Sequence, residues 1–247
     1  MTLSKSAKAM YEIWLSPTQA NDELLIRSGR PNERTMLMPP AKPAEGLESF
    51  NEIATIRVEL EDIEPPIWRE MEAPTSMTLK ALHETIQQLM GWCDYHLWEF
   101  SDENYRYIPP VDDMDWGDKP CRKAGSVRLR DICKDDKTVL TYVYDFGDDW
   151  RMNVSVTDIR QGDPDTSYPR YLGGERAAPP EDCGGVPGFY ELLDAYGDPE
   201  HPDHEEVREW LDERDPHFFD ELPIKYALLR IANRRNAARK RLRPKAT

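Results

Sequence analysis

The sequence has few cysteines and no long apolar run. Its four cysteines are scattered and form no C-x-x-C pair, so neither a zinc knuckle nor a dense disulfide scaffold is expected. No stretch approaches the roughly 18 apolar residues of a membrane-spanning helix. Residues 1–15 lack the unbroken apolar core of a signal peptide. These absences predict a soluble protein of a reducing cytoplasm.

The motifs of several enzyme classes are also missing. The sequence contains no H-E-x-x-H, no G-x-S-x-G and no Gly-rich loop of the kind that cradles phosphates at the start of a helix. The glycine pairs at 173–174 and 184–185 neighbour prolines and acidic residues, which indicates bends around a rigid loop. The sequence therefore does not fit the motif-defined metalloproteases, serine hydrolases or P-loop proteins.

Basic residues are scarce except at the C-terminal end. Residues 1–223 hold all 47 acidic residues and 23 of the 32 basic ones, whereas residues 224–247 hold nine basic residues and no acidic one. An acidic body argues against a protein that wraps nucleic acid and leaves the tail as the candidate phosphate contact. The candidate tail residues are Arg234, Arg235, Arg239, Lys240 and Arg241.

A hairpin with an acidic tip stands at the centre of the sequence. Residues 138–144 are β-branched and aromatic, and residues 150–157 alternate between apolar and polar, which predicts two strands. Between them lie Asp145, Asp148 and Asp149. Aspartate is common in turns because its side chain bonds nearby backbone N–H groups. The same three carboxylates are also candidate metal ligands.

The order of the other predicted elements indicates an α+β domain. We expect a mainly antiparallel sheet packed with helices, a single domain at residues 52–222, an N-terminal extension with a Pro-rich linker at 1–51, and a basic C-terminal helix or tail at 223–247. Strands are predicted near 56–60, 67–72 and 96–100, helices at 78–91, 129–133, 189–196 and from about 202 and 224, and long loops at 109–126 and 162–188.

Several stretches resemble one known family. They are VELEDIEPPIWR (58–69), LHE (82–84) with MGW (90–92), HLWEF (96–100), YVYDFGDDW (142–150), LGGERAAPPEDCGG (172–185) and DPEHP (198–202). Together they are similar to the plasmid pRiA4b ORF-3-like family over roughly two-thirds of the chain. The resemblance implies an α+β domain with mainly antiparallel strands, and some relatives are passengers of plasmids or insertion elements. Many relatives carry cysteine where this chain has Tyr171 and Ala178, so a thiolate metal site is not expected here.

Two functional hypotheses follow from the polar and aromatic residues. The first is a binding or accessory protein of plasmid or mobile-element origin, with a peptide, protein or nucleic-acid partner. Its candidate binding residues are Trp98, Tyr144, Trp150, Arg176 and Glu181, which could line an aromatic groove beside the long loop. The competing interpretation is that the aromatic side chains fill the core.

The second hypothesis is a metal-dependent hydrolase, conceivably acting on phosphodiesters. Carboxylates and imidazoles brought together from distant segments could hold a divalent metal ion or carry out acid–base chemistry. The candidate catalytic residues are His83, His96, Asp145, Asp149, Glu175 and Asp182. A divalent metal is the only cofactor that the residues suggest. The feature that separates the two hypotheses is whether these six side chains converge on one accessible site or scatter among turns.

Overall fold

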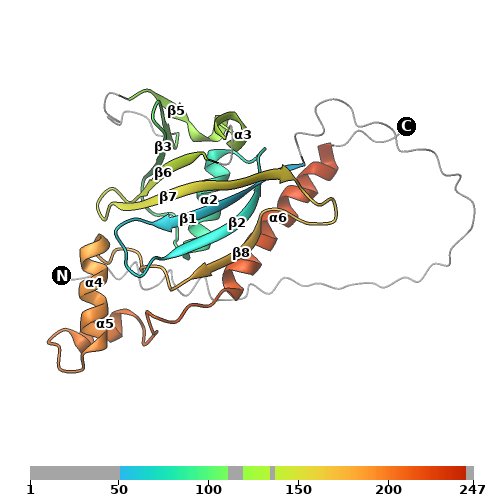
Figure 1. Cartoon of the computed structure of the whole chain (residues 1–247). Helices are drawn as coiled ribbons and strands as arrows, with labels where there is room; N and C mark the ends of the chain where they lie inside the picture. Colours follow the sequence, from blue (N-terminus) through green and yellow to red (C-terminus); the bar gives the residue numbers. More distant parts are fainter. Residues whose placement is uncertain (1–50, 111–118, 134–136, 243–247) are drawn as a thin grey trace, which may run out of the picture. The chain divides into compact units, whose positions relative to one another are not determined.

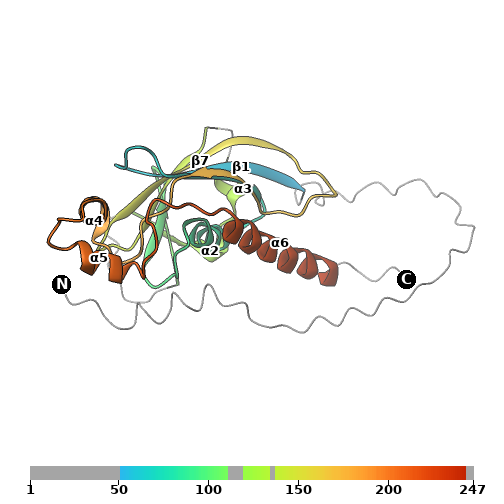
Figure 2. The same cartoon turned by 90° about the horizontal axis from the view of Figure 1, so that it is seen from below.

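The computed structural model describes residues 51–110, 119–133 and 137–242. These residues form an eight-stranded sheet in the order β5-β4-β3-β6-β7-β1-β2-β8. Every neighbouring pair is antiparallel except β4 and β5. Helices α2 and α6 lie on the same face of this sheet (Figures 1 and 2). The predicted α+β class with a mainly antiparallel sheet is confirmed.

The strands are β1 (Glu52–Leu60), β2 (Trp68–Pro74), β3 (Trp98–Ser101), β4 (Arg106–Ile108), β5 (Cys121–Lys123), β6 (Val139–Tyr144), β7 (Trp150–Gln161) and β8 (Arg170–Glu175). The helices are α2 (Leu79–Met90), α3 (Leu129–Ile132), α4 (Gly185–Gly197), α5 (His204–Trp210) and α6 (Leu222–Leu242), with a short 3₁₀ turn at Ala124–Ser126.

The core lies between the sheet and α2. Residues at every second position are buried from Ala54 to Leu60 in β1 and from Trp150 to Val156 in β7, as expected for strands with one face on the core. Helix α2 begins at Thr78, whose side chain accepts a hydrogen bond from Ala81 N, and it ends at Gly91 in the left-handed conformation. Its leucines and Ile86 are fully buried against the strands. The prediction of a helix at 78–91 is confirmed, and the predicted hairpin is β6–β7.

The prediction of a loop over residues 162–188 is wrong in part, because β8 lies within it and pairs with β2. A run with two consecutive glycines is a poor strand signal. At Gly174 the reason for glycine is a close approach, since a Cβ there would lie 2.7 Å from Arg69 Cδ and 2.8 Å from the carbonyl oxygen of Trp68. The expected loop at 109–126 likewise contains β5 and the 3₁₀ turn, with 111–118 outside the described residues.

Two other boundaries differ from expectation. The strand predicted at 96–100 begins at Trp98, so His96 lies in the preceding loop. The helix predicted from about residue 202 begins at His204. None of its own residues is buried, but Leu211, which directly follows it, is buried. The N-terminal extension and linker, apart from residue 51, lie outside the described part of the chain.

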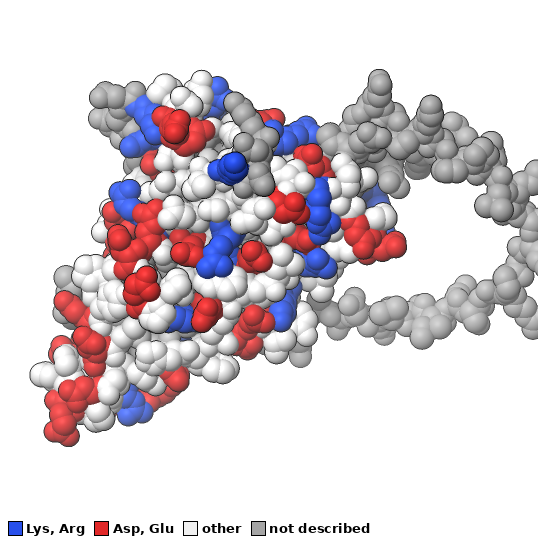
Figure 3. Space-filling view, viewed as in Figure 1, with Lys and Arg blue, Asp and Glu red and all other residues white. Residues whose placement is uncertain are grey.

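Helix α6 packs its apolar side into the core through Ile224 and Leu228. It contacts α2 and β8, so the first half of the basic C-terminal segment is packed against the sheet. Among the described residues, no helix is both long and apolar enough to cross a bilayer. The face of the molecule seen in Figure 3 carries interspersed acidic and basic side chains over the sheet, with acidic ones gathered over α4 and α5.

Candidate metal site

Three loops bring an imidazole and two carboxylates together. His96 comes from the segment between α2 and β3, Asp145 from the turn after β6, and Asp182 from the segment before α4. His96 Nε2 lies 3.0 Å from Asp182 Oδ1 and 3.5 Å from Asp145 Oδ2. One ligand atom from each side chain lies within 4.8 Å of the other two. We call these three residues the His96 cluster.

The turn after β6 aims one oxygen of Asp145 at His96. Asp145 has a φ of 56°, a left-handed conformation that aspartate tolerates better than most residues. Its Oδ1 accepts a hydrogen bond of 2.9 Å from Gly147 N, and its own N–H donates to Leu97 O at 2.9 Å. Oδ2 is left to face the imidazole. The carboxylate therefore serves as a turn former with one oxygen and as a cluster member with the other.

The distances within the cluster are compatible with ligands of one metal ion. Among the described residues, His96 Nε2 is buried and forms no hydrogen bond of good geometry, although Asp182 Oδ1 lies 3.0 Å away. Two ligands about 2.1 Å from a zinc ion at a tetrahedral angle lie about 3.4 Å apart. The side chains of His96, Asp145 and Asp182 are 28%, 13% and 41% exposed, so the cluster is partly exposed although His96 Nε2 itself is buried.

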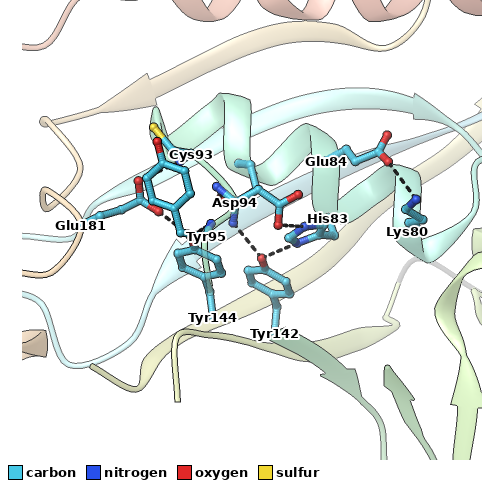
Figure 4. A network of polar contacts seen from close by, with 10 residues as sticks. Lys80, His83, Glu84, Cys93, Asp94, Tyr95, Tyr142, Tyr144 and Glu181 are labelled. Atoms are coloured by element: carbon cyan, nitrogen blue, oxygen red, sulfur yellow. Dashed lines mark hydrogen bonds and ion pairs between the residues drawn. The ribbon is translucent and has the colours of Figure 1, made fainter. Parts of the chain in front are cut away.

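A hydrogen-bond network supports the loop that carries His96 (Figure 4). The Tyr144 hydroxyl donates to Glu181 Oε1 and accepts from Tyr95 N at 3.0 Å. Glu181 Oε2 accepts from Cys93 N at 2.8 Å. Burial raises the pKa of the Glu181 carboxyl despite these bonds, and burial together with Glu181 raises the pKa of Tyr144. Burial also raises the pKa of the Cys93 thiol, which does not suit a nucleophile.

His83 belongs to a separate buried arrangement. Its Nδ1 lies 2.8 Å from the Tyr142 hydroxyl and its Nε2 lies 2.8 Å from Asp94 Oδ1. The imidazole stacks on Trp98 with ring centroids 3.9 Å apart. His83 is therefore packed and hydrogen-bonded inside the domain, and its two nitrogens face Tyr142 and Asp94 instead of the His96 cluster.

The remaining acidic candidates contact residues outside the cluster. Asp149 pairs with Arg151 at 2.9 Å, Asp148 Oδ2 accepts from Gly184 N at 3.1 Å, and Glu175 accepts from Trp68 Nε1 at 3.3 Å. Within the described ranges, the one group of metal-ligand type is the His96 cluster. The structure thus brings together three of the six candidate catalytic residues, and one of the three candidate metal ligands.

Most of the candidate binding residues are packed inside the domain. Trp98, Tyr144 and Trp150 are buried, and Trp92 stacks on Tyr144 and tilts against Trp150. Arg176 donates to Pro65 O, and the two carboxylate oxygens of Glu181 accept hydrogen bonds from Tyr144 and Cys93. Two aromatic residues that neighbour the cluster in the sequence, Tyr95 and Phe146, are exposed instead. They lie in loops, so no hydrophobic periodicity predicted their exposure.

The basic residues of α6 are divided between its two sides. Arg235 is half-buried and donates to Ser76 Oγ at 3.0 Å. Arg234, Lys240 and Arg241 are exposed, as is Arg230, which the sequence analysis did not single out. The side chain of Arg239 lies outside the described part. Three of the five candidate tail residues therefore face solvent.

Comparison with known proteins identifies relatives over most of the domain. A model of the plasmid pRiA4b ORF-3-like protein family matches residues 52–222. The uncharacterized protein y4hQ of Sinorhizobium fredii is 32% identical over 163 residues, which is 66% of this chain and 82% of that protein. The crystal structure of MM3350, a protein of unknown function from Methanosarcina mazei, aligns with a TM-score of 0.65 and 32% identity over 72% of this chain and 98% of that one.

Proposed function

We propose that this chain, which belongs to the plasmid pRiA4b ORF-3-like family, is a metal-dependent hydrolase. The divalent ion would be held by His96, Asp145 and Asp182. The observation that carries the proposal is the convergence of these side chains from three loops, with ligand atoms 3.0 and 3.5 Å from His96 Nε2. The sequence favoured a binding or accessory protein, but the burial of Trp98 and Trp150 weakens the case for an aromatic groove.

The donor set supports a catalytic rather than a structural ion. Structural zinc sites are closed by four protein ligands, whereas catalytic sites have three and keep a position open for water or substrate. The His96 cluster offers three, and the 41% exposure of Asp182 leaves one side open to solvent. One imidazole with two carboxylates suits zinc or manganese. An ion held there would supply a Lewis acid and a water of lowered pKa, which is the chemistry of hydrolysis.

The first test is the melting temperature of the full chain in chelator and then with Zn²⁺, Mn²⁺, Mg²⁺ or Ca²⁺ added singly. A ligand that binds only the folded state stabilises it, by about 2.7 kcal/mol at 100 times the dissociation constant. We expect zinc or manganese to raise the melting temperature. Asp145→Asn and Asp182→Asn should abolish the rise, and both keep a side chain suited to the left-handed backbone at these positions.

Asp149→Asn is the matched control. Asp149 lies in the same turn with a φ of 54°, but its carboxylate pairs with Arg151. This variant should retain the full metal-dependent rise. A flat response to all four ions, or an equal loss in Asp149→Asn, would reject the proposal. If the rise is observed, screens for nuclease and phosphatase activity follow, with Asp182→Asn as the inactive reference.

A second candidate function, contact with nucleic acid, is supported by the exposed side of α6. Arg230, Arg234 and Arg241 occupy positions i, i+4 and i+11, which place them on one side of a helix. All three are exposed. Helix α6 has no acidic residue, so this side could bind a phosphate backbone through charge alone.

A further inference from the structure

We infer that Tyr144 and Glu181 are positioning residues that hold the three ligands of the His96 cluster in register, so that metal affinity depends on the hydrogen bond between them. This inference rests on the metal site proposed above. Neither residue need touch the ion. Each acts through the ligand that follows it in the chain.

The three ligands share one sequence relationship. Each is preceded by a residue of a single hydrogen-bonded chain: Tyr95 precedes His96, Tyr144 precedes Asp145, and Glu181 precedes Asp182. Tyr95 N donates to the Tyr144 hydroxyl at 3.0 Å, and that hydroxyl donates to Glu181 Oε1. The loop before β3, the end of β6 and the segment before α4 are therefore joined at one hydroxyl group, one residue away from each ligand.

The loop that carries His96 is held mainly by side chains. Three consecutive backbone N–H groups donate to side-chain oxygens: Cys93 N to Glu181 Oε2 at 2.8 Å, Asp94 N to Gln87 Oε1 at 2.9 Å, and Tyr95 N to Tyr144 Oη at 3.0 Å. Figure 4 shows Glu181 and Tyr144 close to the residues of this loop. These acceptors help to set the path of the loop, together with the bond from Asp145 N to Leu97 O and the contact of His83 Nε2 with Asp94 Oδ1.

When Glu181 is ionised, it can only accept, which fixes the direction of the hydrogen bond between the two groups. The Tyr144 hydroxyl has one proton, and because its oxygen already accepts from Tyr95 N, that proton goes to Glu181. Both Glu181 oxygens then accept, one from the hydroxyl and one from Cys93 N. A glutamine could satisfy only one of these donors with its carbonyl oxygen. Glu181→Gln therefore breaks at least one bond of the chain while preserving the size of the side chain.

The pair lies beside the ligands without belonging to the cluster, and its hydrogen bonds act on the backbone next to the ligands. Glu181 is not among the residues whose ligand atoms come within 4.8 Å of one another. The ring of Tyr144 meets that of His96 edge to face, with centroids 5.7 Å apart. Loss of groups that orient ligands typically weakens metal binding by about 10- to 100-fold.

The experiment compares metal affinity with metal-free stability in the full chain. The dissociation constant for Zn²⁺ and for Mn²⁺ is measured by calorimetric titration for wild type, Tyr144→Phe and Glu181→Gln. The matched control is Tyr107→Phe, which removes another buried tyrosine hydroxyl that donates to a carboxylate, Asp102 Oδ2 at 2.5 Å, away from the cluster. Hydrogen exchange of the amides of residues 93–96 is measured without metal.

We expect Tyr144→Phe and Glu181→Gln to weaken binding by about 10-fold or more and to speed exchange at residues 93–96. Tyr107→Phe should lower the melting temperature and leave both readouts at their wild-type values. Unchanged affinity in both site variants would overturn the inference. If wild type binds neither ion, the proposed function fails, and exchange alone decides the positioning role: acceleration confined to residues 93–96 supports it, and unchanged exchange overturns it. If Tyr144→Phe does not fold, the isosteric Glu181→Gln carries the test.

Discussion

At the residue scale, aspartates in the left-handed conformation shape the loops of this domain. Asp94, Asp145, Asp149 and Asp182 have φ between 54° and 59°. The sequence allowed two interpretations of the acidic hairpin tip, turn chemistry or a metal site. In Asp145 the two oxygens divide these roles, because Oδ1 bonds Gly147 N and Oδ2 faces His96. Asp149 instead pairs with the Arg151 side chain, and Asp148 Oδ2 accepts a hydrogen bond from Gly184 N in the segment before α4.

Asp102 provides a pH-dependent prediction at this scale. Burial by itself raises the pKa of this carboxyl, but hydrogen bonds from the Tyr107 hydroxyl and from Tyr105 N and Asn104 N outweigh burial and lower it below 3.8. The folded state therefore favours the ionised form. Its stabilising effect is fully present above the pKa of the unfolded chain and is lost as the pH falls through the lowered value.

Asp102→Asn should thus destabilise the protein by about 1 to 2 kcal/mol at pH 7, and its deficit relative to wild type should shrink below about pH 4. Urea unfolding at pH 7, 5, 4 and 3 measures this deficit. Tyr107→Phe, which removes the hydroxyl donor to the carboxylate, should lose stability at pH 7 in the same direction. A deficit of constant size across the whole pH range would show that charge is not the cause.

At the scale of elements, β8 and α4 show how packing overrides local signals. Strand β8 carries two glycines, yet it is anchored by Arg69, a buried guanidinium that donates to the carbonyl oxygens of Leu89, Trp68, Glu175 and Arg176. Burial lowers the pKa of Arg69 to about 10, which still leaves it charged near neutral pH. This one side chain ties β2, the end of α2 and the end of β8 together.

The start of α4 depends on glycine for a different reason. Gly185 has a φ of 67°, and a Cβ there would lie 2.4 Å from the carbonyl oxygen of Asp148. We expect Gly185→Ala to destabilise the fold by about 2 to 4 kcal/mol through backbone strain and overpacking. It should also weaken metal binding, because it pushes the segment of Asp182 away from the turn of Asp145.

Gly197→Ala is the control for this prediction. Gly197 ends the same helix, and a Cβ there meets nothing within 4 Å. Its substitution should be neutral or stabilising by up to about 1 kcal/mol, as helix propensity requires. Denaturant unfolding of both variants measures the difference. Equal destabilisation by the two substitutions would mean that the contact with Asp148 is not the cause.

At the scale of the whole molecule, charge is unevenly distributed. Acidic side chains gather over α4 and α5 (Figure 3), whereas α6 contains seven basic residues and no acidic one. The structure separates the basic residues further, since Arg235 is turned to Ser76 while Arg230, Arg234 and Arg241 remain exposed. A polyanion would meet the exposed arginines and not Arg235.

If α6 contacts nucleic acid, affinity for a labelled DNA duplex should fall steeply between 50 and 200 mM salt. The slope of log affinity against log salt changes by about 0.9 for each phosphate contact removed. Joint replacement of Arg230, Arg234 and Arg241 by glutamine should therefore flatten the slope by about 3, whereas Arg235→Gln should leave it unchanged. Fluorescence anisotropy measures both. An absence of binding at the lowest salt, or equal slopes in the two variants, would reject the nucleic-acid hypothesis.

The sequence alone determined the class of the fold and most of its regular elements. The alternation in β1 and β7 and the apolar stripe of α2 are local patterns with fixed periods, because the burial of one face follows from the spacing of neighbouring residues. The acidic hairpin tip and the basic C-terminal helix could also be identified from the sequence, because each is a local concentration of residues of one charge.

Only the tertiary structure decided which of the candidate site residues meet. His96, Asp145 and Asp182 are separated by 49 and 37 positions in the sequence, and they lie in loops whose paths are set by hydrogen bonds to distant side chains. No periodic pattern encodes such a path, so His83, Asp149 and Glu175 looked equally suitable in the sequence. Tyr144 and Glu181 contact the His96 loop by accepting hydrogen bonds from backbone N–H groups. Every residue except proline has such a group, so the sequence does not show which of them these side chains bind.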